Sequence, residues 1–237
     1  MISTGIEGLD RLLGGGIPEN NQVLLSGGPG AGKTLLAFNI AYNLSKKGIN
    51  SGFICLDEES SMLLRNVKAT FTNIKDIDDL INSKKLAVIK SDIYSKAIQN
   101  TEHIYKINDI IGELTSIISS NRDIRFLVID SLTTLRFIFA EDREFRKALV
   151  TILSFIRRNN IIGLFTSEMY TSERKDLRFN EEFFIFDDIL TMYLNTESNR
   201  RMPLIEVIKS RGTRHQWVAV PYEITPFGVN VIAEQED

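Results

Sequence analysis

The chain has 237 residues, 43% of them hydrophobic and 25% charged, which indicates one globular domain over residues 1–237 and excludes a disordered chain. Its formal net charge of −3 gives no overall attraction to nucleic acid or to an anionic membrane surface. No apolar run is long enough to span a membrane, the start has no signal-peptide pattern, and the single Cys55 excludes an intramolecular disulfide, so we expect a cytoplasmic protein.

A phosphate-binding loop lies near the start of the chain. Residues 27–34 read Gly-Gly-Pro-Gly-Ala-Gly-Lys-Thr, between an apolar run at 23–25 and a helical pattern from Leu35 to Lys47. In such a P-loop the backbone N–H groups cradle phosphate oxygens, Lys33 reaches the β- and γ-phosphates, and the Thr34 hydroxyl ligates Mg²⁺. The sequence therefore predicts a site for a nucleoside triphosphate with Mg²⁺. Its predicted residues are Gly28, Pro29, Gly30, Ala31, Gly32, Lys33, Thr34 and Leu35.

Three consecutive acids follow the second predicted strand. Phe53–Leu56 is a short apolar strand, and Asp57, Glu58 and Glu59 come directly after it. Hydrolysis needs a group that orients a water molecule in line with the γ-phosphate, and a carboxylate at the end of a strand neighbouring the P-loop can do so. We therefore predict catalytic roles for Glu58 and Glu59. A second interpretation, compatible with the first, is that they supply favourable first-turn charges for a helix at Ser60–Ala69.

Strands and helices continue to alternate along the middle of the chain. The apolar patterns predict a strand at Leu86–Ile89, a helix at Ile104–Ile118, a strand at Phe126–Asp130, a helix at Glu144–Arg157 and a strand at Ile161–Thr166. Asp130 ends its strand after four apolar residues, which is the pattern of a Walker B acid that positions Mg²⁺ or its water. The alternative is a strand-ending turn aspartate, and the P-loop in the same chain favours the metal role.

The pattern changes after the last of these strands. Residues 171–182 are polar and highly charged, which predicts a mobile loop. Short strands then follow at Ile189–Leu194, Leu204–Lys209, Val218–Ile224 and Val229–Ile232. The sequence therefore predicts an α/β fold, in which helices flank a central, mostly parallel sheet that carries a C-terminal antiparallel extension.

Several short segments form a combined pattern that goes beyond a lone P-loop. They are Ser3–Asp10, Gly14–Pro18, the P-loop, the Glu58-Glu59 pair, the Asp130-Ser131 pair and Lys209–His215. Together they resemble the KaiC family, RecA-like P-loop ATPases named after the circadian-clock ATPase of cyanobacteria. Glu58 follows Lys33 by 25 residues, which is also the interval in that family. The resemblance covers essentially the whole chain, and it implies a RecA-like fold, ATP rather than GTP as the nucleotide, and a homo-oligomeric ring that is hexameric.

The resemblance also assigns a role to the basic segment near the end of the chain. In KaiC-like rings the matching stretch contacts ATP bound by the adjacent subunit, so Lys209 and Arg211 would act there in trans as catalytic residues. Two basic side chains two residues apart on a strand project from one face, where they can neutralise charge on the γ-phosphate. Ser210, Thr213 and His215 would complete the nucleotide contacts, the last two toward sugar or base. The alternative is a solvated basic edge strand.

This chain departs from the clock protein in three places. The clock protein is a tandem of two such domains, whereas 237 residues accommodate one. Phe183-Phe184 stands where the second clock domain carries its autophosphorylated Ser-Thr pair, so clock-type phosphorylation is not expected. Pro226 stands where the family often has an acid, so we expect base recognition to differ.

Three functions are compatible with these features. The first is an ATPase whose ring changes shape with nucleotide state and signals to unidentified protein partners. The second is a RecA-type recombinase paralogue that contacts DNA through residues 171–182, where three basic residues face four acidic ones, so any DNA binding should be weak. The third is a nucleotide-binding scaffold with little turnover, similar to the archaellum motor accessory ATPase, against which Glu58, Glu59 and Asp130 argue.

Overall fold

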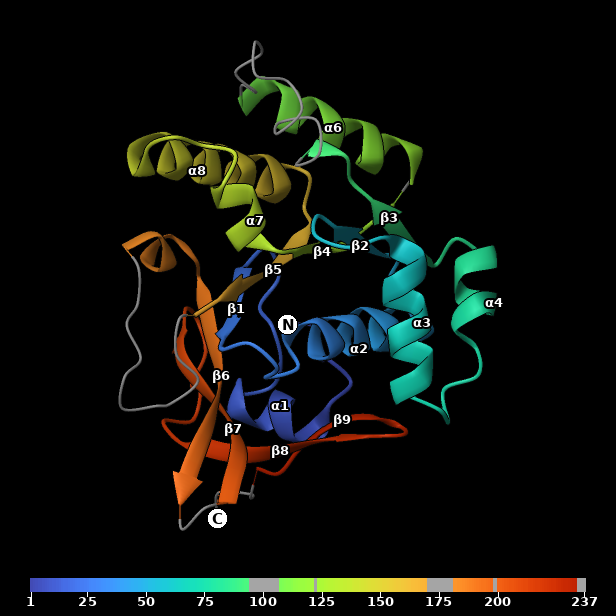
Figure 1. Cartoon of the computed structure of the whole chain (residues 1–237), viewed down its shortest axis with the longest axis vertical. Coiled ribbons are helices and arrows are strands. Elements are labelled where there is room, and N and C mark those ends of the chain that lie inside the picture. Colours follow the sequence, from blue (N-terminus) through green and yellow to red (C-terminus); the bar gives the residue numbers. More distant parts are fainter. Residues whose placement is uncertain (94–106, 122, 170–180, 198–199, 234–237) are drawn as a thin grey trace.

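The computed structural model describes residues 1–93, 107–121, 123–169, 181–197 and 200–233. Within these residues, strands form a sheet in the order β3-β2-β4-β5-β1-β6-β7-β8-β9, and helices lie on both sides of it (Figure 1). The strands are β1 (Gln22–Gly27), β2 (Ser51–Cys55), β3 (Leu86–Lys90), β4 (Phe126–Asp130), β5 (Ile162–Glu168), β6 (Asp188–Glu197), β7 (Arg200–Ser210), β8 (Ala219–Thr225) and β9 (Gly228–Val231).

The sheet has a parallel part and an antiparallel part. Strands β3, β2, β4, β5, β1 and β6 pair in parallel, whereas β7, β8 and β9 are added antiparallel at the β6 edge. The predicted fold class is therefore confirmed. One detail was wrong, because β6 is the first of the late strands and yet runs parallel to β1, so the antiparallel part begins one strand later than predicted.

Two groups of helices bury their apolar sides against the two faces of the sheet. The first group consists of α1 (Glu7–Leu12), α2 (Lys33–Lys46), α3 (Ser60–Thr70) and α4 (Ile77–Asn82), and the second of α6 (Ile107–Ser120), α7 (Leu132–Arg136) and α8 (Asp142–Arg158). On α8 the buried residues recur with the helical period; they are Phe145, Ala148, Leu149, Ile152, Leu153 and Ile156. Figure 1 shows α6, α7 and α8 on one side of β4 and β5, with α2 and α3 on the other.

The N-terminal helix α1 is fixed against the last strand. A Cβ atom added at Gly8 would lie 1.8 Å from the backbone oxygen of Val231, so only glycine permits this close approach. Thr4, which precedes the helix, donates hydrogen bonds from its backbone N–H at 2.7 Å and from its hydroxyl at 2.8 Å to the carboxylate of Asp10 in the helix. The Ser3–Asp10 segment therefore holds the N-terminus against the C-terminal strands.

The short helices α1, α4 and α7 were not predicted. Each has only five or six residues, which is too short for helical periodicity to show in the sequence, and such helices depend on tertiary packing. Residues 171–180 of the predicted charged loop and residues 104–106 of the predicted helix at Ile104–Ile118 lie outside the described residues. The last two loop residues begin a 3₁₀-helix, η2 (Glu181–Ile185). Among the described helices, none is long and apolar enough to cross a membrane.

Candidate nucleotide-binding site

The predicted P-loop connects β1 to α2. Residues 28–32 form the turn, and Lys33, Thr34 and Leu35 form the first turn of the helix. Gly32 has a φ of +85°, so the backbone conformation at this position favours glycine. The Tyr222 hydroxyl on β8 donates a hydrogen bond to the Ala31 carbonyl. The antiparallel extension thus supports the loop from outside.

Lys33 lies over the loop. Its Nζ donates hydrogen bonds to the carbonyl oxygens of Gly27 and Gly28, at 3.0 Å each. Burial lowers the pKa of Lys33, and the carboxylates of Glu168 and Asp130 act in the opposite direction. An ammonium group and the N-terminus of α2 therefore meet at the turn, which is the arrangement that binds phosphate groups.

Asp130 ends β4 beside the first turn of α2. The Thr34 hydroxyl donates to Asp130 Oδ2 at 2.9 Å, and the Thr166 hydroxyl on β5 donates to Oδ1. Burial raises the pKa of Asp130, although both hydroxyl hydrogen bonds lower it, and a cation nearby would favour the ionised form.

These donor groups fit Mg²⁺. That ion takes an octahedral shell of oxygen ligands and usually keeps several waters beside one or two protein groups and the substrate phosphates. No cluster of three or more histidine, cysteine or acidic side chains suited to a metal occurs among the residues that the structure describes. Thr34 and Asp130 would therefore hold Mg²⁺ together with water and the nucleotide, rather than in a closed protein site.

The three acids after β2 have different surroundings. Asp57 Oδ2 accepts a hydrogen bond from the Ser131 hydroxyl at 2.9 Å. Glu58 is half-buried, and burial followed by the charges of Asp130 and Asp57 raises its pKa. Glu59 is exposed, occupies the N-cap position of α3, and lies 3.9 Å from Nζ of Lys90. Glu58 thus senses the charge of Asp130, whereas Glu59 lies at the N-cap of α3, directly before the first turn that the second interpretation named.

The strand that neighbours the P-loop was assigned wrongly. We predicted that the acid pair follows such a strand, but β4 and β5 lie between β2 and β1. The direct neighbours of β1 are β5 and β6, and the last residue of β5, Glu168, is in register with Gly27. The Glu168 backbone N–H donates to the Thr133 hydroxyl at 2.8 Å. Sequence reasoning missed Glu168, although an acid just after an apolar strand was the same signal that identified Asp130.

The basic segment near the end of the chain is not one continuous strand face. β7 ends at Ser210, so Arg211, Thr213 and His215 lie in the following turn and loop. Lys209 Nζ donates to the carbonyl oxygens of Phe184, at 3.2 Å, and Phe186. The prediction of a shared strand face is therefore wrong beyond Ser210.

Acidic residues at the start of β6 hold this segment. Asp187, which is largely buried, lies 2.6 Å from Arg157 and 3.4 Å from Arg211, whose side chain remains 60% exposed. Its neighbour Asp188 accepts a hydrogen bond from the Ser210 hydroxyl at 2.8 Å. The sequence analysis did not single out either aspartate. β7 lies between β6 and β8, but its pairing with β8 covers only Leu204, Ile205 and Glu206, so the alternative of an edge strand stays open for Lys209 and Ser210.

The strand register places the basic segment far from the P-loop of its own chain. Asp188 is in register with Val23 at the start of β1 and with Ser210 at the end of β7. The P-loop follows Gly27, four residues further along β1, or about 13 Å at the usual rise per strand residue. Lys209 and Arg211 therefore lie at the opposite edge of the sheet from the P-loop.

Two polar atoms in the same loop lack a partner. Thr213 Oγ1 and His215 Nε2 are buried and have no hydrogen bond within the described part of the chain. Burial of such atoms costs free energy unless a partner is supplied. The His215 ring packs 4.9 Å, centroid to centroid, from the exposed Trp217. This loop therefore has hydrogen-bonding capacity that the described part of the chain leaves unused.

Comparison with known proteins identifies the family. A family profile described as "ATPase: KaiC" matches residues 2–236. The chain belongs to the KaiC ATPase family. A KaiC-like protein of the archaeon Pyrococcus horikoshii has a similar solved structure, with a TM-score of 0.81, 25% sequence identity and 98% of each chain covered. The resemblance inferred from the motifs is confirmed, and membership of this P-loop family implies nucleotide binding.

Relatives of both one-domain and longer types match the chain. A UPF0273 protein of Pyrobaculum aerophilum is 30% identical over 98% of this chain and 82% of its own length. One of Pyrococcus horikoshii is 27% identical over 99% of this chain and 94% of its own length. The circadian clock oscillator protein KaiC 1 of Synechocystis is 25% identical over 97% of this chain but only 44% of its own length. The chain thus spans less than half of that clock protein.

The environments of Glu58 and Glu59 lead to a prediction that separates them. Glu58→Gln should keep ATP binding and lower the hydrolysis rate by about 10²-fold or more, because the amide keeps the shape but cannot act as a base. Glu59→Gln, the matched control, should retain most activity because it removes only an exposed charge at the N-cap position of α3 and its 3.9 Å ion pair with Lys90. Phosphate release and nucleotide affinity of both variants provide the test. Equal loss in both variants would contradict a distinct role for Glu58.

Proposed function

We propose that this KaiC-family protein hydrolyses ATP with Mg²⁺ at the interfaces between subunits of a homo-oligomeric ring, which is a hexamer. Residues 1–237 act as one ATPase domain, and the nucleotide state is coupled to protein partners that remain to be identified. The observation that carries this proposal is the division of the candidate site between two opposite edges of the sheet.

One edge holds the groups that bind the nucleotide and the metal ion. Lys33 and the turn before it would bind the phosphates, and Thr34 with Asp130 would hold Mg²⁺. Glu58 would orient the attacking water, and burial, followed by the charges of Asp130 and Asp57, raises its pKa.

The other edge holds groups suited to a neighbour's nucleotide. Lys209 and Arg211 cannot reach their own P-loop across the length of β1, so a phosphate they contact would belong to another subunit. The exposed Arg211 guanidinium can stabilise charge on that phosphate. Thr213 Oγ1 and His215 Nε2, which lack partners within the described residues, would gain hydrogen-bond partners if the sugar hydroxyls or the base nitrogens of that nucleotide lie beside this loop.

The test measures assembly and turnover on the same sample. Native mass should increase to that of a ring, six subunits in our proposal, on addition of ATP and Mg²⁺, and phosphate should be released. A ring without phosphate release would favour the scaffold function. Full phosphate release from a monomer would contradict a shared site.

A further inference from the structure

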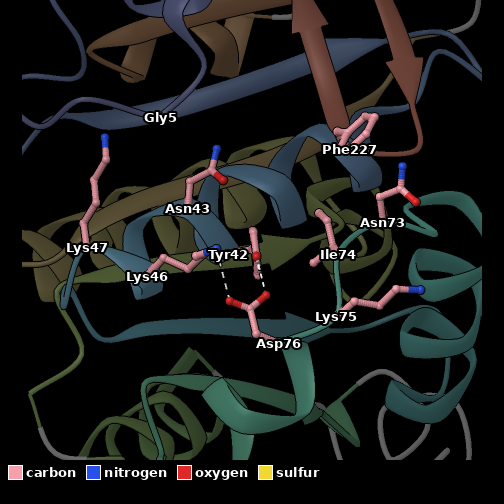
Figure 2. A pocket seen from close by; sticks show the side chains of 10 residues that line it. All are labelled: Gly5, Tyr42, Asn43, Lys46, Lys47, Asn73, Ile74, Lys75, Asp76 and Phe227. Atoms are coloured by element: carbon pink, nitrogen blue, oxygen red, sulfur yellow. Dashed lines mark hydrogen bonds and ion pairs between the residues drawn. The ribbon is translucent and has the colours of Figure 1, made fainter.

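A second cleft lies over the C-terminal half of α2. It has a volume of about 580 Å³, which is within the range of small-molecule sites. Its lining comes from α2, from the segment between α3 and α4, from the β8–β9 turn and from the N-terminal segment. The lining residues are Gly5, Tyr42, Asn43, Lys46, Lys47, Asn73, Ile74, Lys75, Asp76 and Phe227. Figure 2 shows their side chains around the opening.

Hydrogen bonds between distant segments fix the walls of this cleft. The Asn73 backbone N–H donates to the Pro226 carbonyl at 3.0 Å, which ties the segment before α4 to the β8–β9 turn. On the floor, the Asp76 carboxylate accepts a hydrogen bond from the Tyr42 hydroxyl and pairs with Lys46 at 3.1 Å (Figure 2). The cleft is therefore formed before any ligand arrives, which reduces the entropic cost of binding.

The cleft has an excess of positive charge in a protein of net charge −3. Its lining includes three lysines, Lys46, Lys47 and Lys75, but only one acid, Asp76. Asp76 is paired with Lys46, whereas Lys47 Nζ contacts the Ser3 hydroxyl at 2.8 Å and Lys75 Nζ contacts the Thr72 carbonyl at 2.6 Å. Within the described part of the chain, these two lysines have only neutral partners. Either lysine can therefore pair with an anionic group of a ligand.

The cleft also has an exposed aromatic ring at its rim, in addition to its positive charge. Phe227 is 74% exposed, and Figure 2 shows its ring beside Asn73 and Ile74 at the rim. A planar base can stack on such a ring. The side-chain amides of Asn43 and Asn73 offer hydrogen-bond donors and acceptors for the edge of a base or for a ribose.

A simpler interpretation explains part of this arrangement. Lysines in the last turn of a helix are stabilised by the helix dipole, which accounts for Lys46 and also for Lys47 directly after α2. It does not account for Lys75 or Phe227, which come from other segments and face the same cleft. Convergence of three segments is typical of a ligand site.

The cleft is distinct from the P-loop site. Tyr42 and Lys46 follow Lys33 on the same helix by nine and 13 residues, which places them about 13 and 20 Å further along its axis. We infer that this cleft is a second ligand site, which binds a nucleoside monophosphate with its base against Phe227 and its phosphate beside Lys75. This inference depends neither on ATP hydrolysis nor on ring formation. Because α2 begins at Lys33 and its C-terminal half lines the cleft, a ligand in the cleft would contact the same helix that carries Lys33.

The experiment titrates AMP into the protein after its P-loop has been saturated with a non-hydrolysable ATP analogue and Mg²⁺. Calorimetry should show one additional AMP per chain. Phe227→Ala should weaken this binding by about fivefold or more through loss of stacking, and Lys75→Ala should weaken it and reduce its salt dependence. Adenosine and inorganic phosphate, tested separately, should each bind more weakly than AMP.

Matched controls separate the cleft from general surface effects. Phe137→Ala removes an aromatic ring that is 71% exposed on another part of the surface, and Lys147→Ala removes an exposed lysine of α8. Both should leave AMP binding unchanged. The inference is overturned if AMP does not bind, if both cleft variants bind it as the unchanged protein does, or if inorganic phosphate binds as tightly as AMP. Loss of hydrolysis in a separate assay of the same protein with ATP would concern the P-loop site alone.

Discussion

Replacement of Lys33 with alanine should abolish measurable ATP binding. The Lys33 ammonium group is buried against the loop carbonyls at 3.0 Å. Truncation of one partner of a buried charge pair weakens binding by on the order of 10²-fold or more. The measurement is equilibrium binding of ATP with Mg²⁺, with melting of the nucleotide-free protein as a check on folding.

Lys147→Ala is the matched control for this variant. It removes one positive charge from an exposed position on α8, so it tests whether total charge accounts for the effect. Its ATP affinity should equal that of the unchanged protein. Wild-type affinity in a folded Lys33→Ala protein would show that the loop is not the nucleotide site.

Two variants that are inactive alone should recover activity when mixed. If Arg211 acts on the neighbour's ATP, then Lys33→Ala and Arg211→Ala subunits in one ring form some interfaces with an intact P-loop half and an intact basic half. An arginine in such a position contributes about 10³-fold or more to the rate, so even a minority of rebuilt interfaces should release measurable phosphate. The register at β1, β6 and β7 is the structural basis, because it separates the two halves within one chain.

The design has a control that mixing cannot rescue. Lys33 and Glu58 belong to the same half of the site, so a mixture of Lys33→Ala and Glu58→Gln subunits should remain inactive. Subunit exchange is checked with labelled protein. Proven exchange without recovery in the first mixture would place Arg211 outside the reaction, as a surface residue paired with Asp187.

The sequence predicted the local elements near the P-loop well. The strand Phe126–Asp130 was predicted with the observed bounds, and the helix Ser60–Ala69 ends one residue later in the structure. These elements carry strong apolar patterns, which reflect burial on one or both faces. The order of the strands was not predictable in the same way. Glu168 and not Glu58 follows the strand next to the P-loop, because pairing is decided by contacts between segments far apart in the chain.

The sequence by itself identified the phosphate loop and the KaiC family. It also identified Thr34 and Asp130 as candidate ligands of Mg²⁺. These depend on residue identity at short spacing, and the constraint is local: glycine is needed at φ +85° in the turn, and a lysine and a hydroxyl must follow it. Only the tertiary structure decided that β6 is parallel, that Lys209 and Arg211 lie at the edge opposite the P-loop, and that Lys75 and Phe227 face one cleft. Strand register and the convergence of distant segments arise from packing of the whole sheet, and no short stretch of sequence encodes them.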